Sequence, residues 1–226
     1  MRNRVSAACL AVFTVIFLGS ALPAKAAPGM YLGAGFGAVA PEFGGSHLDP
    51  ISFDTGLNWE LNGGLNFTKN LGLNMQLGQM FGAGSTSLYG DLTYSQIYLT
   101  SGLHLVYDSQ DPSRNETSKF QPYVDLGLGV YGLTLNSPDA SITETYDPAF
   151  GVRIALGMNM FLIEKTNLYI APEISYHMVN YSASTWDDPL GSVYQTGLDA
   201  NGNSLLLQVK IGYHMLMNGR ETLAAR

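Results

Sequence analysis

Seven ionisable side chains recur at positions that could place them in one environment. Each lies in a stretch where apolar and polar residues alternate, and each falls on the polar parity: Glu60, His104, Asp125, Arg153, Glu173, His177 and Lys210. Successive side chains of a strand point to opposite faces, so this parity puts all seven on the same face of a sheet. If that face is buried, the opposite charges must pair, because a charge removed from water needs a partner.

Glu173 and Lys210 are the centre of the expected charge network. Counted from the ends of their strands, they lie at similar depth on neighbouring strands. Arg153 belongs to the strand on the other side of Glu173, and Asp125 to the strand before that. We therefore expect Lys210 to pair with Glu173, and Arg153 to join from the other side. A gated ion path or a small ligand pocket is the functional alternative to a network that only fills a narrow lumen.

The acidic residues outside these stretches gather in four long segments. Residues 41–55, 82–94, 134–148 and 180–203 contain no Lys or Arg, and their acids are Glu42, Asp49, Asp54, Asp91, Asp139, Glu144, Asp147, Asp187, Asp188 and Asp199. Carboxylates suit Ca²⁺ or Mg²⁺, but no EF-hand spacing occurs. We expect a solvated, repulsive rim without a metal site or a cofactor.

The longest of these segments, 180–203, also carries aromatic residues. Asp-Pro at 188–189 and Asn-Gly at 201–202 are turn formers, so the segment should fold back on itself. Aromatic residues are enriched at binding surfaces, and this predicts a contact surface. Its candidate residues are Trp186, Asp187, Asp188 and Tyr194. Anchoring of Trp186 at the level of lipid headgroups is the alternative.

Residues 127–132 (GLGVYG) match the glycine pattern GxGxxG of dinucleotide-binding sites. That site needs the pattern between a strand and a helix, with an acidic residue about 20 residues further on. Here the pattern lies inside an alternating stretch. We therefore expect neither a nucleotide site nor a nucleic-acid partner.

Alternation of apolar and polar residues predicts eight strands. In residues 57–67 (LNWELNGGLNF) nearly every odd position is large and apolar, while the even positions are Asn, Glu or Gly. The same period of two recurs in eight segments: 30–40, 56–67, 71–81, 95–107, 120–133, 149–162, 167–179 and 204–217. Each has about 11–14 residues, which is enough for a tilted strand that crosses a bilayer. Helical periodicity is missing after residue 27.

The apolar face of these strands is expected to point outward. One parity is almost purely hydrocarbon, as at Val152 and Leu156, and the other holds Gly, Asn, Gln and Thr rather than the Lys and Glu of a soluble surface. Short connections at 68–70 and 163–166 alternate with the long acidic segments, which is typical of membrane barrels. The chain is therefore expected to be all-β, an eight-stranded antiparallel up-and-down transmembrane β-barrel. Pro172 must fall at a bulge or leave one carbonyl unpaired, because every strand of a closed barrel is central.

The start of the chain has the features of an export signal. A positive beginning (MRNR) precedes an apolar stretch, and residues 24–26 (AKA) form a small-x-small cleavage site. Cys9, the only cysteine, lies inside this signal, so the mature chain would have no disulfide and no thiolate metal site. We expect a signal peptide at 1–26, the barrel at 27–217 and a short tail at 218–226.

Three stretches combine glycine with alternating apolar residues: YLGAGFG (31–37), PYVDLGLG (122–129) and KIGYHMLM (210–217). They resemble the small eight-stranded outer-membrane β-barrels of Gram-negative bacteria, OmpA/OmpX-like in the broad sense. The resemblance implies a monomer in the outer membrane, surrounded by lipid and lipopolysaccharide. The last stretch is similar to the assembly signal of that family, although methionine stands where aromatic residues are usual and nine residues follow. It implies contact of the outer-membrane assembly machinery with Lys210, Gly212, Met215 and Met217.

An enzyme is a further alternative. Lipid A deacylases, which are barrels of similar size, show a His-x-Ser-Asn stretch on a late strand. The corresponding stretch here is 177–180 (HMVN), with Val179 at the nucleophile position and His177 on the inward parity. No nucleophile–base pair survives at that spacing, so we expect no catalytic residue and no enzymatic activity. The leading hypothesis is a non-enzymatic outer-membrane protein with a structural, adhesive or envelope-integrity role. A narrow, porin-like channel or carrier for small molecules is the alternative.

Overall fold

The structure is a computed structural model that describes residues 29–45, 48, 51–68, 70–86, 90–107, 120–138, 141–162 and 167–216. The regular elements within these ranges are all strands. No helix among them is long and apolar enough to cross a membrane. The expected signal peptide at 1–26, the expected tail at 218–226, and Met217 lie outside the described residues.

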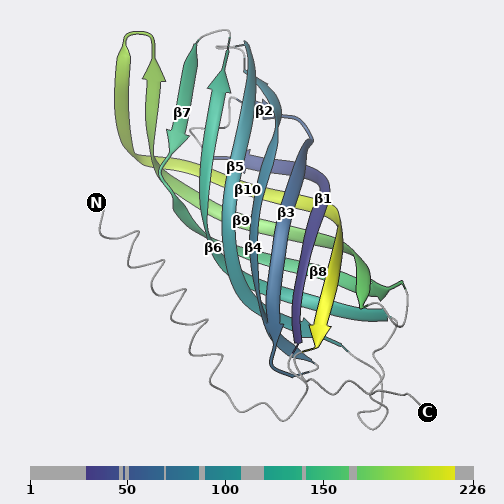
Figure 1. Cartoon of the computed structure of the whole chain (residues 1–226). Coiled ribbons are helices and arrows are strands. Elements are labelled where there is room, and N and C mark those ends of the chain that lie inside the picture. The colour runs from purple at the N-terminus through teal and green to yellow at the C-terminus, as the bar shows by residue number, and fades with distance from the viewer. Residues whose placement is uncertain are drawn as a thin grey trace, which may run out of the picture.

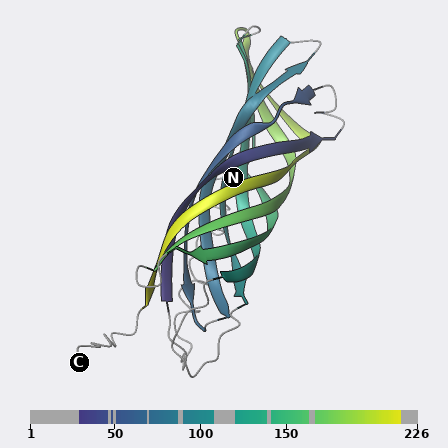
Figure 2. The same ribbon diagram turned by 90° about the vertical axis from the view of Figure 1, so that its right-hand side faces the viewer.

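Eight long antiparallel strands close into a barrel. They are β1 (Gly29–Gly44), β3 (Gly56–Asn66), β4 (Leu71–Thr86), β5 (Gly90–Val106), β6 (Phe120–Ser137), β8 (Ala149–Phe161), β9 (Leu168–Asp188) and β10 (Gly191–Leu216). Each pairs with the next in this order, and β10 pairs back with β1, so the ring has no free edge at its middle. The strands are steeply tilted, as both views show (Figures 1 and 2).

Two short strands lie at the upper end of the barrel in Figure 1. β2 (Ile51–Phe53) pairs with the end of β4, and β7 (Ile142–Tyr146) lies between the upper parts of β6 and β9. The eight-stranded all-β architecture predicted from the alternation is confirmed.

The apolar parity faces outward, also as predicted. Phe36, Leu128 and Phe150 are 59%, 68% and 69% exposed, and Leu57 and Leu61 from the LNWELNGGLNF stretch are 45% and 53% exposed. A water-soluble chain would bury such residues, since each removed from water stabilises a fold by about 1.5–3 kcal/mol. Exposure of a continuous apolar belt around a closed barrel is the arrangement that hydrocarbon solvent favours.

The strands extend beyond their predicted ends into the four long acidic segments. β4 extends to Thr86, and β5 begins at Gly90. β9 extends to Asp188 and β10 begins at Gly191, so only residues 189–190 connect β9 with β10. The Asn-Gly pair at 201–202 lies inside β10 rather than in a turn. Beyond the apolar belt the outer face of a strand meets water instead of hydrocarbon, so the chain keeps its backbone pairing but loses the contrast between apolar and polar residues from which strands are recognised.

Tyrosine rings lie over glycines inside the barrel. Tyr31 is paired across strands with Gly64, and Tyr123 with Gly157. A Cβ atom added at Gly64 would lie 2.5 Å from the Tyr31 ring, and one at Gly157 would lie 2.3 Å from the Tyr123 ring. The inward glycines therefore provide room for aromatic side chains in a lumen that eight strands leave narrow.

Pro172 interrupts one ladder, as expected. On one side, Pro172 is paired with Val209 of β10. On the other side, the β8–β9 ladder has no assigned pair between Gly157↔Glu173 and Met160↔Ile170, although its register does not change. Proline has no N–H to give, so the gap falls on the side where that N–H would be needed.

Candidate functional site

A central charge network occupies the middle of the lumen. It consists of Glu60 on β3, Asp125 on β6, Arg153 on β8, Glu173 on β9 and Lys210 on β10, each at most 5% exposed. Lys210 Nζ lies 2.7 Å from Glu60 Oε1 and 2.7 Å from Glu173 Oε2. Arg153 contacts Glu173, and its Nη1 lies 3.5 Å from Asp125 Oδ2. The two cations thus meet Glu173 from the strands on either side of β9, which is the contact expected from their positions.

Neutral donors complete the hydrogen bonding of these carboxylates. Tyr123 donates its hydroxyl to Glu173 Oε2 at 2.8 Å, and Gln208 Nε2 donates to Glu173 Oε1 at 2.7 Å. Tyr98 donates to Glu60 Oε2 at 3.0 Å. The sequence reasoning missed these three residues, although they share the inward parity of the charges, because neutral side chains were not considered as partners. Pairing and hydrogen bonding together make buried charge tolerable.

His104 joins the network at its lower end. Its Nδ1 lies 2.6 Å from Asp125 Oδ1. The His104 ring also lies 5.2 Å from the Tyr31 ring and 5.1 Å from the Tyr123 ring, measured between centroids. Below the charges, Tyr31, Tyr123 and Tyr169 are buried together in an apolar floor.

His177 lies beside the charge network without an ion pair to it among the described contacts. It is the cross-strand neighbour of Arg153, and its ring lies 4.9 Å from the ring of Tyr98, measured between centroids. Its Nδ1 is 3.1 Å from the Tyr131 hydroxyl, and its Nε2 is 3.4 Å from Ser175 Oγ. The Ser175 neighbour was missed because it precedes His177 instead of following it. His177 is fully buried and Ser175 is 1% exposed, so this serine–histidine contact has no access to a substrate from the described surface. A nucleophile needs both a base and an accessible reaction partner, and here only the base is present.

The upper lumen differs from the expected lining. Small polar residues were predicted for the inward parity, but Val39, Met80, Leu133 and Leu206 are fully buried there. Leu48, from the connection between β1 and β2, is buried in the same cluster and covers its upper end. These apolar side chains contact one another out of water, and predicted polar residues are buried beside them: Gln96 contacts Tyr181, and Ser204 contacts Met80. Among the described residues, buried side chains therefore lie both above and below the charge network.

The predicted contact residues lie on a hairpin that rises beyond the barrel. β9 and β10 remain paired from Gly191↔Asp188 to Thr196↔Ala183, and Figure 1 shows this hairpin at the upper left, outside β7. Asp188 Oδ1 accepts hydrogen bonds from the backbone N–H groups of Leu190 and Gly191 at 2.7 and 3.0 Å, so this carboxylate closes the turn.

The other three contact candidates lie below the tip. Trp186 is half-buried and is paired across strands with Val193, and Asp187 is exposed. Tyr194 donates its hydroxyl to Asp147 Oδ2 at 2.8 Å. This hydrogen bond raises the pKa of Tyr194, because it stabilises the protonated phenol. The structure brings the four candidates together on one hairpin, well away from the central charge network.

The residues of the expected assembly signal point in different directions. Lys210 lies in the charge network, Gly212 lies under the Tyr169 ring, and Met215 is 36% exposed on the outer face. Contact of these residues with the assembly machinery remains a proposal that rests on their order along β10.

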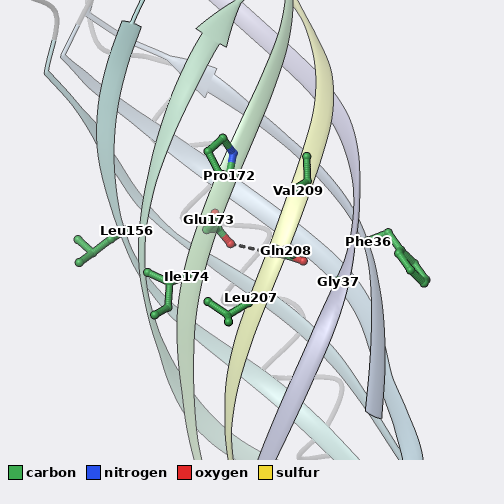
Figure 3. A pocket seen from close by; sticks show the side chains of 9 residues that line it. All are labelled: Phe36, Gly37, Leu156, Pro172, Glu173, Ile174, Leu207, Gln208 and Val209. Atoms are coloured by element: carbon green, nitrogen blue, oxygen red, sulfur yellow. Dashed lines mark hydrogen bonds between the residues drawn. The ribbon is translucent and has the colours of Figure 1, made fainter. Parts of the chain in front are cut away.

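A shallow depression of about 500 Å³ lies on the outer face beside the interrupted ladder. Phe36, Leu156 and Pro172 line it toward the outside, and Glu173 and Gln208, joined by their hydrogen bond, line it toward the lumen (Figure 3). The depression therefore lies next to Glu173, a member of the charge network, and Gln208, which contacts it.

No group of three or more His, Cys, Asp or Glu side chains that could hold a metal ion occurs in the part of the chain described.

The profile of the outer membrane protein beta-barrel domain family matches residues 6–201, and the chain belongs to this family. No curated protein matches the sequence. Solved structures share the fold at low identity. OprG of Pseudomonas aeruginosa is 19% identical with a TM-score of 0.56, over 85% of this chain and 98% of that one. Neisserial surface protein A is 10% identical with a TM-score of 0.55, over 82% of this chain and 96% of that one.

A major outer membrane protein of Thermus thermophilus is 13% identical with a TM-score of 0.50, over 84% of this chain and 100% of that one. Family, fold and apolar belt agree that this is a β-barrel of the cell outer membrane. The end at which β9 and β10 project corresponds to the extracellular side, since membrane barrels have short turns on the periplasmic side.

Proposed function

We propose that the protein is a non-enzymatic outer-membrane protein that acts at the cell surface through its extracellular hairpins, in adhesion or in maintenance of the envelope. The projecting β9–β10 hairpin carries this proposal. Leu190 at its tip is 97% exposed, and Val193 and Tyr194 are 54% and 49% exposed. A stable hairpin that displays large apolar side chains to water is typical of a surface that contacts a partner.

The buried side chains above and below the charge network support a surface role over a pore. Above the charges lies the apolar cluster closed by Leu48, and below them lies the tyrosine floor. Eight-stranded barrels leave room for little more than side chains. We expect purified, refolded protein to give silent planar bilayers. Steady single-channel steps would instead support the channel hypothesis.

The test of the surface role replaces residues 182–200 with a short Gly/Ser linker. The β1–β10 pairing that closes the barrel begins at Gly44↔Asn201, below the removed part. The variant should therefore fold and stay heat-modifiable on a gel, while cells that display it should lose adhesion to whatever surface the intact protein binds. Unchanged adhesion would contradict the proposal, and loss of folding would make the hairpin a structural lid.

Transport of small molecules through the barrel wall is the second candidate, and the depression beside Pro172 favours it. The inward Glu173–Gln208 pair is among the residues that line this depression (Figure 3). Uptake of small apolar solutes by proteoliposomes tests it. Uptake above that of protein-free liposomes, lost when Leu156 is changed to Trp to fill the depression, would support transport.

A further inference from the structure

The upper part of β10 has an open strand edge. β10 pairs with β1 only from Asn201 downward, and among the described residues the segment 191–197 pairs on one side only, with β9. In Figure 1 the β10 arm of the hairpin is the outermost element, with no other strand beyond it. An open edge presents unpaired N–H and C=O groups, which can add a strand from another chain.

The direction of the backbone groups follows from one hydrogen bond. Asp147 N donates to Ala183 O at 2.9 Å, so Ala183 turns its backbone groups away from β10. Orientation alternates along a strand, so Ser184 and Trp186 face β10, where they are paired with Gln195 and Val193. The backbone groups of Ser192, Tyr194 and Thr196 must therefore point to the open side.

This edge lacks the usual protection against pairing. Natural edge strands are commonly blocked by Lys, Pro or inward charges. Residues 191–198 (GSVYQTGL) contain no charged residue and no proline. The only irregularity is a shift of register between Thr196 and Ala200, at the base of the hairpin, where Gly197 has a φ of 75°. The edge above it is a regular strand.

The charge around the edge selects among the chains that could pair with it. The long extracellular segments contain no Lys or Arg, and Asp147, Asp187 and Asp199 near the hairpin are exposed. A second copy of this chain would bring the same acids to the same place. An extended segment with Lys or Arg would complement them and would gain in rate and specificity of association.

We propose that the outer edge of β10 over residues 192–196 binds an extended, cationic segment of a partner protein as an added β-strand. This inference rests on the proposed surface function and specifies its partner: a strand, paired through backbone hydrogen bonds at Ser192, Tyr194 and Thr196, with basic side chains beside the acidic rim. Side chains of the partner would lie alternately on the two faces of the hairpin.

The test uses the full mature chain in uncharged detergent micelles and three labelled, capped heptapeptides. The first alternates lysine with valine, the second has glutamate in place of lysine, and the third is the lysine peptide with alternate backbone amides N-methylated. Fluorescence anisotropy should show saturable binding of the lysine peptide. The glutamate peptide should bind at least about tenfold more weakly, because it loses charge complementarity. The N-methylated peptide should also bind at least about tenfold more weakly, because it loses main-chain hydrogen bonds.

A matched pair of variants separates the backbone from the side chains. Ser192→Pro with Thr196→Pro removes two outward N–H groups that β9 does not use, and Ser192→Ala with Thr196→Ala removes the same side chains but keeps the amides. The proline variant should bind the lysine peptide at least about tenfold more weakly than the alanine variant, which should match the native chain. Heat-modifiability on a gel checks that both barrels fold.

Four results would overturn the inference: no saturable binding of the lysine peptide, equal binding of the glutamate or N-methylated peptide, equal binding by the folded proline variant, or a dimer of the native chain that the proline variant does not form. The last result would make a second copy the occupant of the edge. If the proline variant still adheres to surfaces while the linker variant does not, the surface function stands and the added strand does not.

Discussion

At the scale of single residues, the lumen is governed by the need to pair buried charge. The central charge network contains three carboxylates and two permanent cations, and His104 contacts the carboxylate farthest from Lys210. Each carboxylate also accepts hydrogen bonds from neutral side chains such as Gln208 and Tyr123. Every member then has a charged partner, although Arg153 Nε has no hydrogen-bond partner among the described residues, and this pairing makes the buried charges tolerable.

Lys210→Met should lower the free energy of unfolding by about 3–5 kcal/mol, because it leaves Glu60 and Glu173 buried with only Arg153 between them. Lys210→Met combined with Glu173→Leu restores the balance of charge and should recover much of this loss. Urea unfolding of the refolded protein measures both. If the double variant is no more stable than Lys210→Met alone, Lys210 and Glu173 are not energetic partners.

Asp188 makes a separate, local contribution at the tip of the hairpin. Asp188→Ala removes the acceptor for the N–H groups of Leu190 and Gly191, and should cost about 1 kcal/mol locally. Hydrogen exchange should become faster at these two amides and stay unchanged in the barrel strands. Unchanged exchange at the tip would show that the backbone alone holds the turn.

At the scale of elements, the strands fit together through aromatic rings over glycines. Gly157→Ala would place a Cβ atom 2.3 Å from the Tyr123 ring, and this ring is held by the hydrogen bond from Tyr123 to Glu173. The substitution should therefore cost about 1–3 kcal/mol through overpacking. Gly132→Ala is the matched control, because a Cβ there meets nothing within 4 Å. Equal urea midpoints of the two variants would contradict the packing explanation.

At the scale of the whole molecule, charge is distributed unequally between the two ends of the barrel. The long extracellular segments hold no Lys or Arg, whereas the sequence between β3 and β4, between β5 and β6, and between β8 and β9 contains Lys69, Arg114, Lys119 and Lys165. Such a division orients the protein for partners of opposite charge outside the cell.

Trypsin added to intact cells should therefore leave the chain uncut, although a protease specific for aspartate and glutamate should cut it. After the envelope is opened, trypsin should cut in the connection that contains Arg114 and Lys119, and a denaturing gel should show two fragments. Tryptic fragments from intact cells would mean that the orientation is reversed.

The sequence by itself determined the eight membrane strands, the outward direction of their apolar face and the inward position of the seven ionisable residues, because a period of two is a local property that each strand carries alone. Only the tertiary structure decided how far β9 and β10 extend, since pairing between strands continues where water on both faces removes any alternation. It also decided that the polar contacts of His177 are with Ser175 and Tyr131 although Arg153 is its cross-strand neighbour, and that Val39, Leu48 and Leu206 are buried together in the upper lumen. Those contacts join strands that are distant in sequence, and their depth depends on register and tilt, which no single segment specifies.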